Sequence, residues 1–308
     1  MRRRIFAGAL VVAPAIVAAA RAQAPLTFAT AGAGSLFLPY GQGLAKIVEA
    51  AGAARIAIRQ TRGSNDNLDI VDADPSAIGC SFLGSAYDAL NGTGFAAGRP
   101  HGNVRALFPM YETAFMAAAL KAKNISSVKS LDTKRVGCGP AEGYFRAAAE
   151  IAGIKPVIVG GTPADNGKAL LAGEIDAFWQ GASVPIPSLV AVATAADCVV
   201  FGLSDTEAAA MLKRFPYMTN FGAPAGTYRG QIKPITSVAA WNVVIAHKDM
   251  AEATAYAVTK SVLSSKDLVA AAGAAAASTK ASNAGMNKVV PYHPGAVKAL
   301  AELGVKVN

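Results

Sequence analysis

The sequence predicts an α/β protein of two lobes joined by a hinge, with a ligand cleft between them. Apolar runs of strand length alternate with longer segments of helical periodicity, and this alternation occurs in two blocks. Such alternation is typical of a parallel or mixed sheet covered by helices. A strongly strand-like run at residues 237–246 follows the second block and would return the chain to the first lobe. Two crossings of the chain would therefore connect the lobes.

The two blocks contain elements of similar length in similar order. In the first block we expect strand 26–31, helix 36–53, strand 55–61, the start of a helix at 64–71 and strand 78–82. The second block begins near Tyr111. There we expect strand 115–120, turn 130–133, strand 135–139, helix 143–152, strand 156–159, helix 164–171 and strand 177–179. In open sheets of this kind, ligands bind in the loops at the carboxyl ends of the strands.

The two crossings set the expected lobe boundaries. Residues 23–112 together with 236–308 would form the first lobe, and residues 113–235 would form the second. Once the first 22 residues are removed, 286 of the 308 remain, which is enough for two lobes with cores of their own.

Residues 1–22 are typical of a cleaved export signal. Three arginines at 2–4 precede an uncharged run at 5–20, and the segment ends in the small-residue pattern Ala-Arg-Ala. A helix over that run would be roughly 24 Å long, shorter than a hydrocarbon core of about 30 Å, so a membrane anchor is the weaker interpretation. The arginine pair also resembles a twin-arginine signal. We therefore expect a periplasmic protein exported by the Sec or the twin-arginine route.

Composition argues against several classes of function. The mature chain keeps 25 basic and 20 acidic residues, without a cluster of basic and aromatic side chains, so we expect no nucleic-acid binding. The histidines and cysteines occur at no metal-ligand spacing, and no serine lies in a nucleophile-elbow pattern. We therefore predict no catalytic residue, no metal and no cofactor. Cys80, Cys138 and Cys198 are expected to be small buried hydrophobes, with a disulfide between two of them as the alternative.

Two glycine-containing loops at strand ends are the first candidates for ligand contact. Residues 30–35 join the first strand to the first helix, where glycines permit close backbone approach and the helix start offers free N–H groups to an anion. Phe37 stands where a dinucleotide fingerprint needs a further glycine, which disfavours a nucleotide cofactor. Residues 63–68 repeat the arrangement, with Ser64 as an N-cap or as a ligand contact. Tight turns without a ligand are the alternative for both loops.

Several short motifs occur in a characteristic order along the mature chain. They are Phe37, Leu38, Pro39 and Gly41; Gly63, Ser64, Asn67 and Leu68; Leu131, Asp132, Lys134, Arg135 and Val136; Gly173, Ile175, Asp176, Ala177 and Phe178; Pro216 and Tyr217; residues 224–228; and residues 293–296 followed by 302–304. In order and spacing they resemble the TAXI family of TRAP transporter solute-binding receptors.

The resemblance implies a periplasmic receptor with the two-lobed, type II-like fold of periplasmic binding proteins. Such a receptor closes on a small solute, a carboxylate or an amino acid, and delivers it to a TRAP-type membrane permease. Three departures from the family pattern concern the ligand. Phe37 and Leu38 replace tyrosines, Phe82 replaces a glutamine, and the loop from residue 139 to 144 lacks hydroxyls but contains Glu142.

These departures predict a more apolar pocket with a negative charge at Glu142. That charge would repel a second ligand carboxylate or pair with a ligand amino group. The alternative is that Glu142 points to solvent and only favours the helix N-terminus.

The candidate ligand-binding residues lie in these loops and at the ends of later strands. They are Gly34, Ser35, Phe37, Ser64, Asn67, Phe82, Glu142, Gly143, Tyr144, Trp179, Ser183 and Tyr228. Trp179 would either stack on the ligand or pack the lobe. His293, which precedes Pro-Gly, is expected to form structural hydrogen bonds rather than to contact the ligand.

Two other functions remain alternatives. An orphan receptor of the same fold would report its ligand to a membrane sensor instead of a permease. An exported hydrolase would pair one of the histidines with a serine, which the missing nucleophile motif disfavours.

Overall fold

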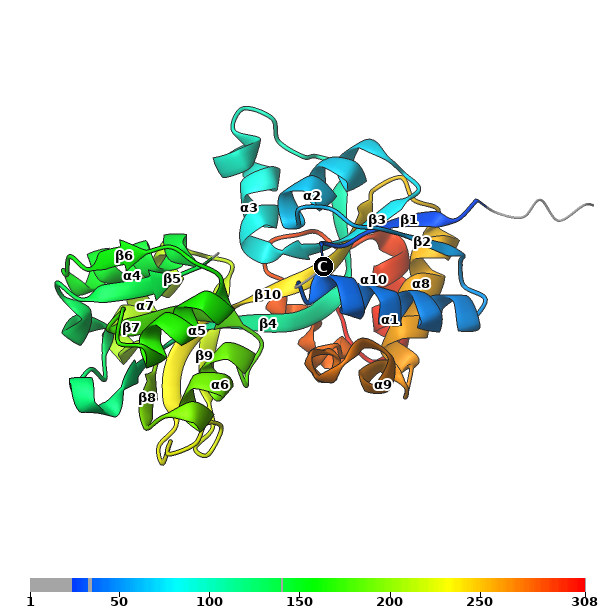
Figure 1. Ribbon diagram of the computed structural model, residues 1–308. Helices are drawn as coiled ribbons and strands as arrows, with labels where there is room; N and C mark the ends of the chain where they lie inside the picture. Colours follow the sequence, from blue (N-terminus) through cyan, green and yellow to red (C-terminus); the bar gives the residue numbers. More distant parts are fainter. Residues whose placement is uncertain (1–23, 33–34, 140, 308) are drawn as a thin grey trace, which may run out of the picture.

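The computed structural model describes residues 24–32, 35–139 and 141–307, which form two α/β lobes joined by two long strands (Figure 1). The long strands are β4, Val104–Leu120, and β10, Ile235–His247. The predicted two-lobed α/β fold is therefore confirmed. The predicted export signal at 1–22 lies outside the described residues.

The described strands form one mixed sheet, in the order β2-β1-β3-β10-β4-β7-β5-β6, with β8 paired to β4 and β9 paired to β10. Parallel pairing joins β1 to β2 and β3 in the first lobe, and β5 to β6 and β7 in the second. β10 is antiparallel to β3, β4 and β9. The shorter strands are β1 Leu26–Ala29, β2 Ile56–Arg59, β3 Ala77–Phe82, β5 Arg135–Cys138, β6 Val157–Val159, β7 Ala177–Ala182, β8 Cys198–Phe201 and β9 Met218–Ala223.

Helices surround the strands of each lobe (Figure 1). The first lobe contains α1 Phe37–Ala50, α2 Ser64–Ala73, α3 Leu83–Asn91, α8 Glu252–Ser264, α9 Leu268–Ala272 and α10 Pro294–Glu302. The second contains α4 Glu142–Ala152, α5 Pro163–Leu171, α6 Pro187–Ala195 and α7 Asp205–Arg214. None of the described helices combines the length and the apolar character that a membrane span requires.

The predicted strands and helices lie where they were expected, but the two crossing strands are longer. The predicted strand 115–120 is the last part of β4, and the predicted strand 237–246 extends at both ends to form β10. Both strands are buried along almost their whole length. An apolar run buried on both faces has no polar alternation, so its sequence does not mark where pairing starts.

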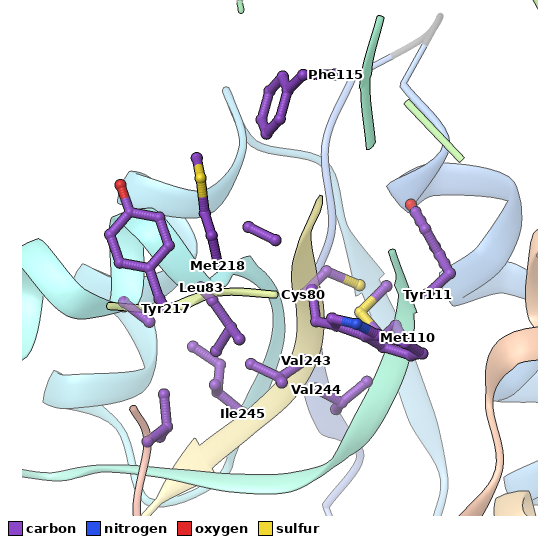
Figure 2. Close-up of a cluster of buried hydrophobic side chains, with 14 of the residues drawn as sticks. Cys80, Leu83, Met110, Tyr111, Phe115, Tyr217, Met218, Val243, Val244 and Ile245 are labelled. Carbon is purple, nitrogen blue, oxygen red and sulfur yellow. The ribbon is translucent and has the colours of Figure 1, made fainter. Parts of the chain in front are cut away.

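One apolar core continues through the crossing. It includes Cys80 and Leu83 next to β10, Val244 on β10, and Met218 at the start of β9, which Figure 2 shows on either side of the crossing strands. A smaller cluster in the second lobe contains Phe178 and packs beneath α5 and α6. Burial of large side chains at the crossing stabilises the junction by roughly 1.5–3 kcal/mol for each residue.

The cysteines are free thiols, so the disulfide alternative is wrong. Cys80 and Cys138 are buried, as predicted, and Cys198 is half-buried. Burial raises the pKa of the Cys138 thiol to about 12. The buried thiols therefore stay protonated at neutral pH and pack as small apolar groups.

His293 is a structural residue, as predicted. It is the N-cap of α10, where its Nδ1 accepts a hydrogen bond from the Gly295 N–H at 3.1 Å. Its Nε2 lies 3.1 Å from the Met250 carbonyl oxygen and donates to it. Burial favours the neutral ring and lowers the pKa of His293 below its ordinary value of 6.5.

We expect acid to destabilise the chain through His293. The unfolded chain takes up a proton on this ring near its ordinary pKa of 6.5, whereas the folded chain takes it up only at lower pH. The contribution to stability is thus complete above the unfolded pKa and is lost as the pH falls through the folded pKa. Between pH 7.5 and pH 5.5, the free energy of unfolding measured in urea should fall more for the wild type than for His293→Asn. The amide oxygen of the asparagine can still cap α10. An equal loss in both proteins would contradict this role.

Candidate functional site

Asn67 ties together the ends of three strands in the first lobe. Its Nδ2 donates to the carbonyl oxygens of Thr30 and Cys80, both at 2.7 Å, and its Oδ1 accepts from the Thr61 hydroxyl at 2.7 Å. Thr30 and Thr61 follow β1 and β2, and Cys80 lies in β3. The Asn67 side chain is completely buried. Both amide hydrogens are used, so Asn67 holds the candidate loops in place and has no donor left for a ligand.

Ser64 is the first residue of α2 rather than its N-cap, so the N-cap prediction is wrong. Gly63 occupies the cap position with a φ of 124°, a conformation that favours glycine. The Ser64 hydroxyl oxygen instead accepts a hydrogen bond from the Phe82 N–H at 3.0 Å. Ser64 therefore connects the start of α2 to the end of β3.

The loop after β1 is described only in part, and Gly34 lies outside the described residues. The Ser35 hydroxyl accepts a hydrogen bond from the Phe37 N–H at 3.2 Å. Phe37 begins α1, where its half-buried ring packs against the main core. Both side chains thus stand at the N-terminus of α1, which favours negative charge.

Four aromatic residues join the two lobes, and we call them the interlobe aromatic cluster: Phe82, Tyr87, Tyr144 and Tyr217. Phe82 and Tyr87 belong to the end of β3 and to α3, Tyr144 belongs to α4, and Tyr217 immediately precedes β9. The ring centroids are 5.8 Å apart for Phe82–Tyr144, 6.3 Å for Phe82–Tyr217 and 5.5 Å for Tyr87–Tyr217. Gly84 permits this approach, because a Cβ at Gly84 would lie 2.5 Å from the Tyr144 hydroxyl oxygen.

Two hydroxyls in this cluster are hydrogen-bonded to each other. The hydroxyl oxygens of Tyr144 and Tyr217 are 3.2 Å apart. Burial raises the pKa of both phenols above the ordinary value, so both stay protonated at neutral pH. Since one of the two protons forms the shared bond, the other is available to a ligand oxygen. The pair supplies a donor near the β5–α4 loop, which lacks serine and threonine.

The free carboxylate that we expected at Glu142 is absent, because Arg146 pairs with it. Glu142 begins α4, and its Oε1 lies 2.6 Å from Nη2 and 2.8 Å from Nε of Arg146. The two residues are one helical turn apart, and both side chains are exposed. This exposed ion pair offsets part of the negative charge that we expected Glu142 to present to a ligand. Gly143 beside it is exposed, with open space next to its Cα.

Trp179 and Tyr228 are core residues, which corrects their prediction as ligand contacts. Trp179 is completely buried and stacks on Phe115 with a centroid distance of 6.3 Å. The structure therefore supports the alternative in which Trp179 packs the lobe. The Tyr228 hydroxyl accepts a hydrogen bond from the Ile186 N–H at 3.0 Å and lies 3.8 Å from the Met116 sulfur. Each ring fills the interior of the second lobe instead of facing the first.

Ser183 follows β7 at the crossing of the lobes. Its hydroxyl donates to Oε1 of Glu112 on β4 at 3.3 Å. Sequence reasoning missed Glu112, although an acid within the apolar run of β4 was a usable signal. It also missed Tyr217 as a site residue, because nothing near Tyr217 in the sequence indicates that it meets α3.

Two cavities lie within the second lobe. One, of about 750 Å³, runs between β8 and the segment 229–236, and the other, of about 510 Å³, lies beside α7. None of the candidate residues that the structure describes lines either cavity. The described candidate residues therefore lie outside these two cavities.

Comparison with known proteins agrees with this architecture. MatC from Rhodopseudomonas palustris with bound malate has a TM-score of 0.52 at 16% identity, over 82% of this chain and 90% of that chain. A TctC solute binding protein from Polaromonas, without ligand, has a TM-score of 0.56 at 13% identity, over 80% and 86% of the two chains. An R. palustris protein with adipate has a TM-score of 0.53 at 11% identity, over 91% and 95%.

At these identities the likeness is one of fold, and the fold is one that solute-binding proteins adopt. The model of the NMT1-like family matches residues 28–304, which is nearly the whole described chain. The chain therefore belongs to the NMT1-like family.

Proposed function

We propose that this chain is a periplasmic solute receptor of the TAXI type. It captures a small organic acid or an amino-acid-like solute and delivers it to a TRAP-type membrane permease. The observation that carries this proposal is the meeting of two lobes, joined by β4 and β10, at an aromatic cluster beside the loops after β2 and β3. The export pattern at 1–22 and the motif order support the same function. Malate and adipate in the structural neighbours support a small carboxylate as the solute.

In this proposal the lobes are residues 23–112 with 236–308, and residues 113–235. The solute contacts come from the candidate residues nearest the junction, which are Ser35, Phe37, Ser64, Phe82, Gly143, Tyr144 and Ser183, together with Tyr217. Asn67 contributes indirectly by holding the loops. The aromatic walls favour a solute with one carboxylate over a dianion, because an unpaired buried charge is costly.

A screen of organic acids and amino acids by thermal shift, followed by calorimetry and small-angle scattering, tests the proposal. We expect a small carboxylate or amino acid to raise the melting temperature and to reduce the radius of gyration as the lobes close. If no such compound binds, or if saturating solute leaves the scattering profile unchanged, the proposed function is wrong. Genes for TRAP permease subunits beside this gene would favour delivery, and a gene for a membrane sensor there would favour an orphan receptor.

A further inference from the structure

Glu112 is a buried acid without a cationic partner among the described residues. Its side chain is only 7% exposed. The Ser183 hydroxyl donates to its Oε1 at 3.3 Å, and no Lys, Arg or His nitrogen of the described residues lies within 4.0 Å of the carboxylate. Its Oε2 accepts no hydrogen bond from a described residue. A mostly buried carboxylate that has no cationic partner among the described residues can take one from a ligand.

A β-bulge places Glu112 at the crossing of the two lobes. Trp241 pairs with Glu112 across the β4–β10 ladder, and Val243 pairs with Pro109, so two residues of β4 lie opposite Asn242 alone. The Asn242 side chain holds the bulge by donating to the Tyr111 carbonyl oxygen at 3.0 Å and to the neighbouring Thr113 hydroxyl at 3.0 Å. Bulges re-aim side chains and are frequent beside functional sites.

Two neighbours of Glu112, Trp241 and Ser183, have side chains that can bind an ammonium group. Trp241 lies directly opposite on β10, so the two side chains share one face of the sheet, and the Trp241 ring is also only 7% exposed. An indole ring attracts a cation, a carboxylate pairs with it, and the Ser183 oxygen can accept one of its hydrogen bonds. A divalent metal would need more acidic or histidine ligands, and no group of three or more such residues occurs in the described part of the chain.

We infer that Glu112, with Trp241 and Ser183, holds a positively charged amino group of the solute. This inference rests on the proposed function and narrows it to solutes that combine an ammonium group with a carboxylate. The amino group predicted to pair with Glu142 is thus assigned to Glu112, because Arg146 already pairs with Glu142. The solute carboxylate is left to the N-terminus of α1, because Phe115, against which the Tyr144 ring packs at 4.7 Å, points from β4 to the face of the sheet opposite Glu112.

Calorimetry with matched probes tests this assignment. Each probe pair differs by the amino group: glutamate with glutarate, alanine with propionate, and 4-aminobutyrate with butyrate. We expect the wild type to prefer the aminated member of a bound pair by at least about tenfold. Glu112→Gln should lower the affinity for the aminated compound by about thirtyfold or more, as for one partner lost from a buried charge pair. The affinity for the compound without the amino group should stay within about threefold of the wild-type value. Ser183→Ala should give a smaller loss in the same direction.

The control variant is Glu150→Gln, which removes an exposed acid that pairs with Arg214 at 2.6 Å on the protein surface. It should leave every probe affinity unchanged. Equal binding of both members of a pair to the wild type, or equal weakening of both by Glu112→Gln, would overturn the ammonium site while leaving the receptor function intact.

A measurement without solute tests the premise of the inference separately from solute binding. Glu112→Gln removes a mostly buried charge that has no cationic partner among the described residues, so without solute this variant should melt at a higher temperature than the wild type. A lower melting temperature would mean that the carboxylate is needed by the fold itself, and the inference would be wrong. Failure of every probe, together with failure of every other compound in the thermal-shift screen, would overturn the proposed function and with it the ammonium site.

Discussion

Asn67→Ala is expected to destabilise the folded chain by about 3 to 5 kcal/mol. The substitution removes three hydrogen bonds of 2.7 Å and leaves the buried carbonyl oxygens of Thr30 and Cys80 without their donor. Each buried group left unpaired costs about 1–3 kcal/mol. For a chain of this size the melting temperature should fall by roughly 10 °C. Calorimetric melting and urea unfolding of the purified protein measure the effect.

Asn166 provides a matched control for Asn67. It is also buried, and it lies in α5, the helix that follows the second parallel strand of its own lobe. Its amide makes one longer hydrogen bond, to the Gly161 carbonyl oxygen at 3.4 Å. Asn166→Ala should therefore cost only about 1 kcal/mol. Equal losses for the two variants would show that the three-strand connection through Asn67 contributes no special stability.

Gly84→Ala is expected to weaken solute binding by more than about tenfold, equivalent to about 1.4 kcal/mol. A Cβ at Gly84 would lie 2.5 Å from the Tyr144 hydroxyl oxygen and 2.6 Å from the Phe82 ring, so both side chains would have to shift and the contact between the lobes would change. Alanine is a better helix former than glycine by about 1 kcal/mol, so α3 itself should not be weakened. The radius of gyration should increase, and solute should no longer reduce it to the wild-type value.

The control for this variant is Gly102→Ala. A Cβ at Gly102 would have no atom within 4 Å, and its φ is not in the left-handed region. Scattering and calorimetry should not distinguish it from the wild type. If Gly84→Ala also behaved as the wild type, the interlobe aromatic cluster would not be part of the closed receptor.

The candidate site could be predicted only in part from the sequence. Ser64 was predicted from its glycine-containing loop, and Phe82 was predicted from the resemblance to the TAXI family; the structure connects the two residues by a hydrogen bond of 3.0 Å. Trp179 and Tyr228, which were also predicted as ligand contacts, are buried in the second lobe. An aromatic residue near a strand end gives the same local signal whether it faces another lobe or its own core, because its direction is set by packing.

The sequence by itself determined the alternation of strands and helices, the division into two blocks and the return of the chain through a strand at residues 237–246. These features depend on periodicity and turn residues, which act over a few positions. Only the tertiary structure decided which charges and hydroxyls are free. Glu142 is paired within its own helix, whereas Glu112 depends on Ser183, 71 residues away, and Tyr144 on Tyr217, 73 residues away. Such partners are brought together by burial of a shared core, and local sequence patterns do not predict the contacts within that core.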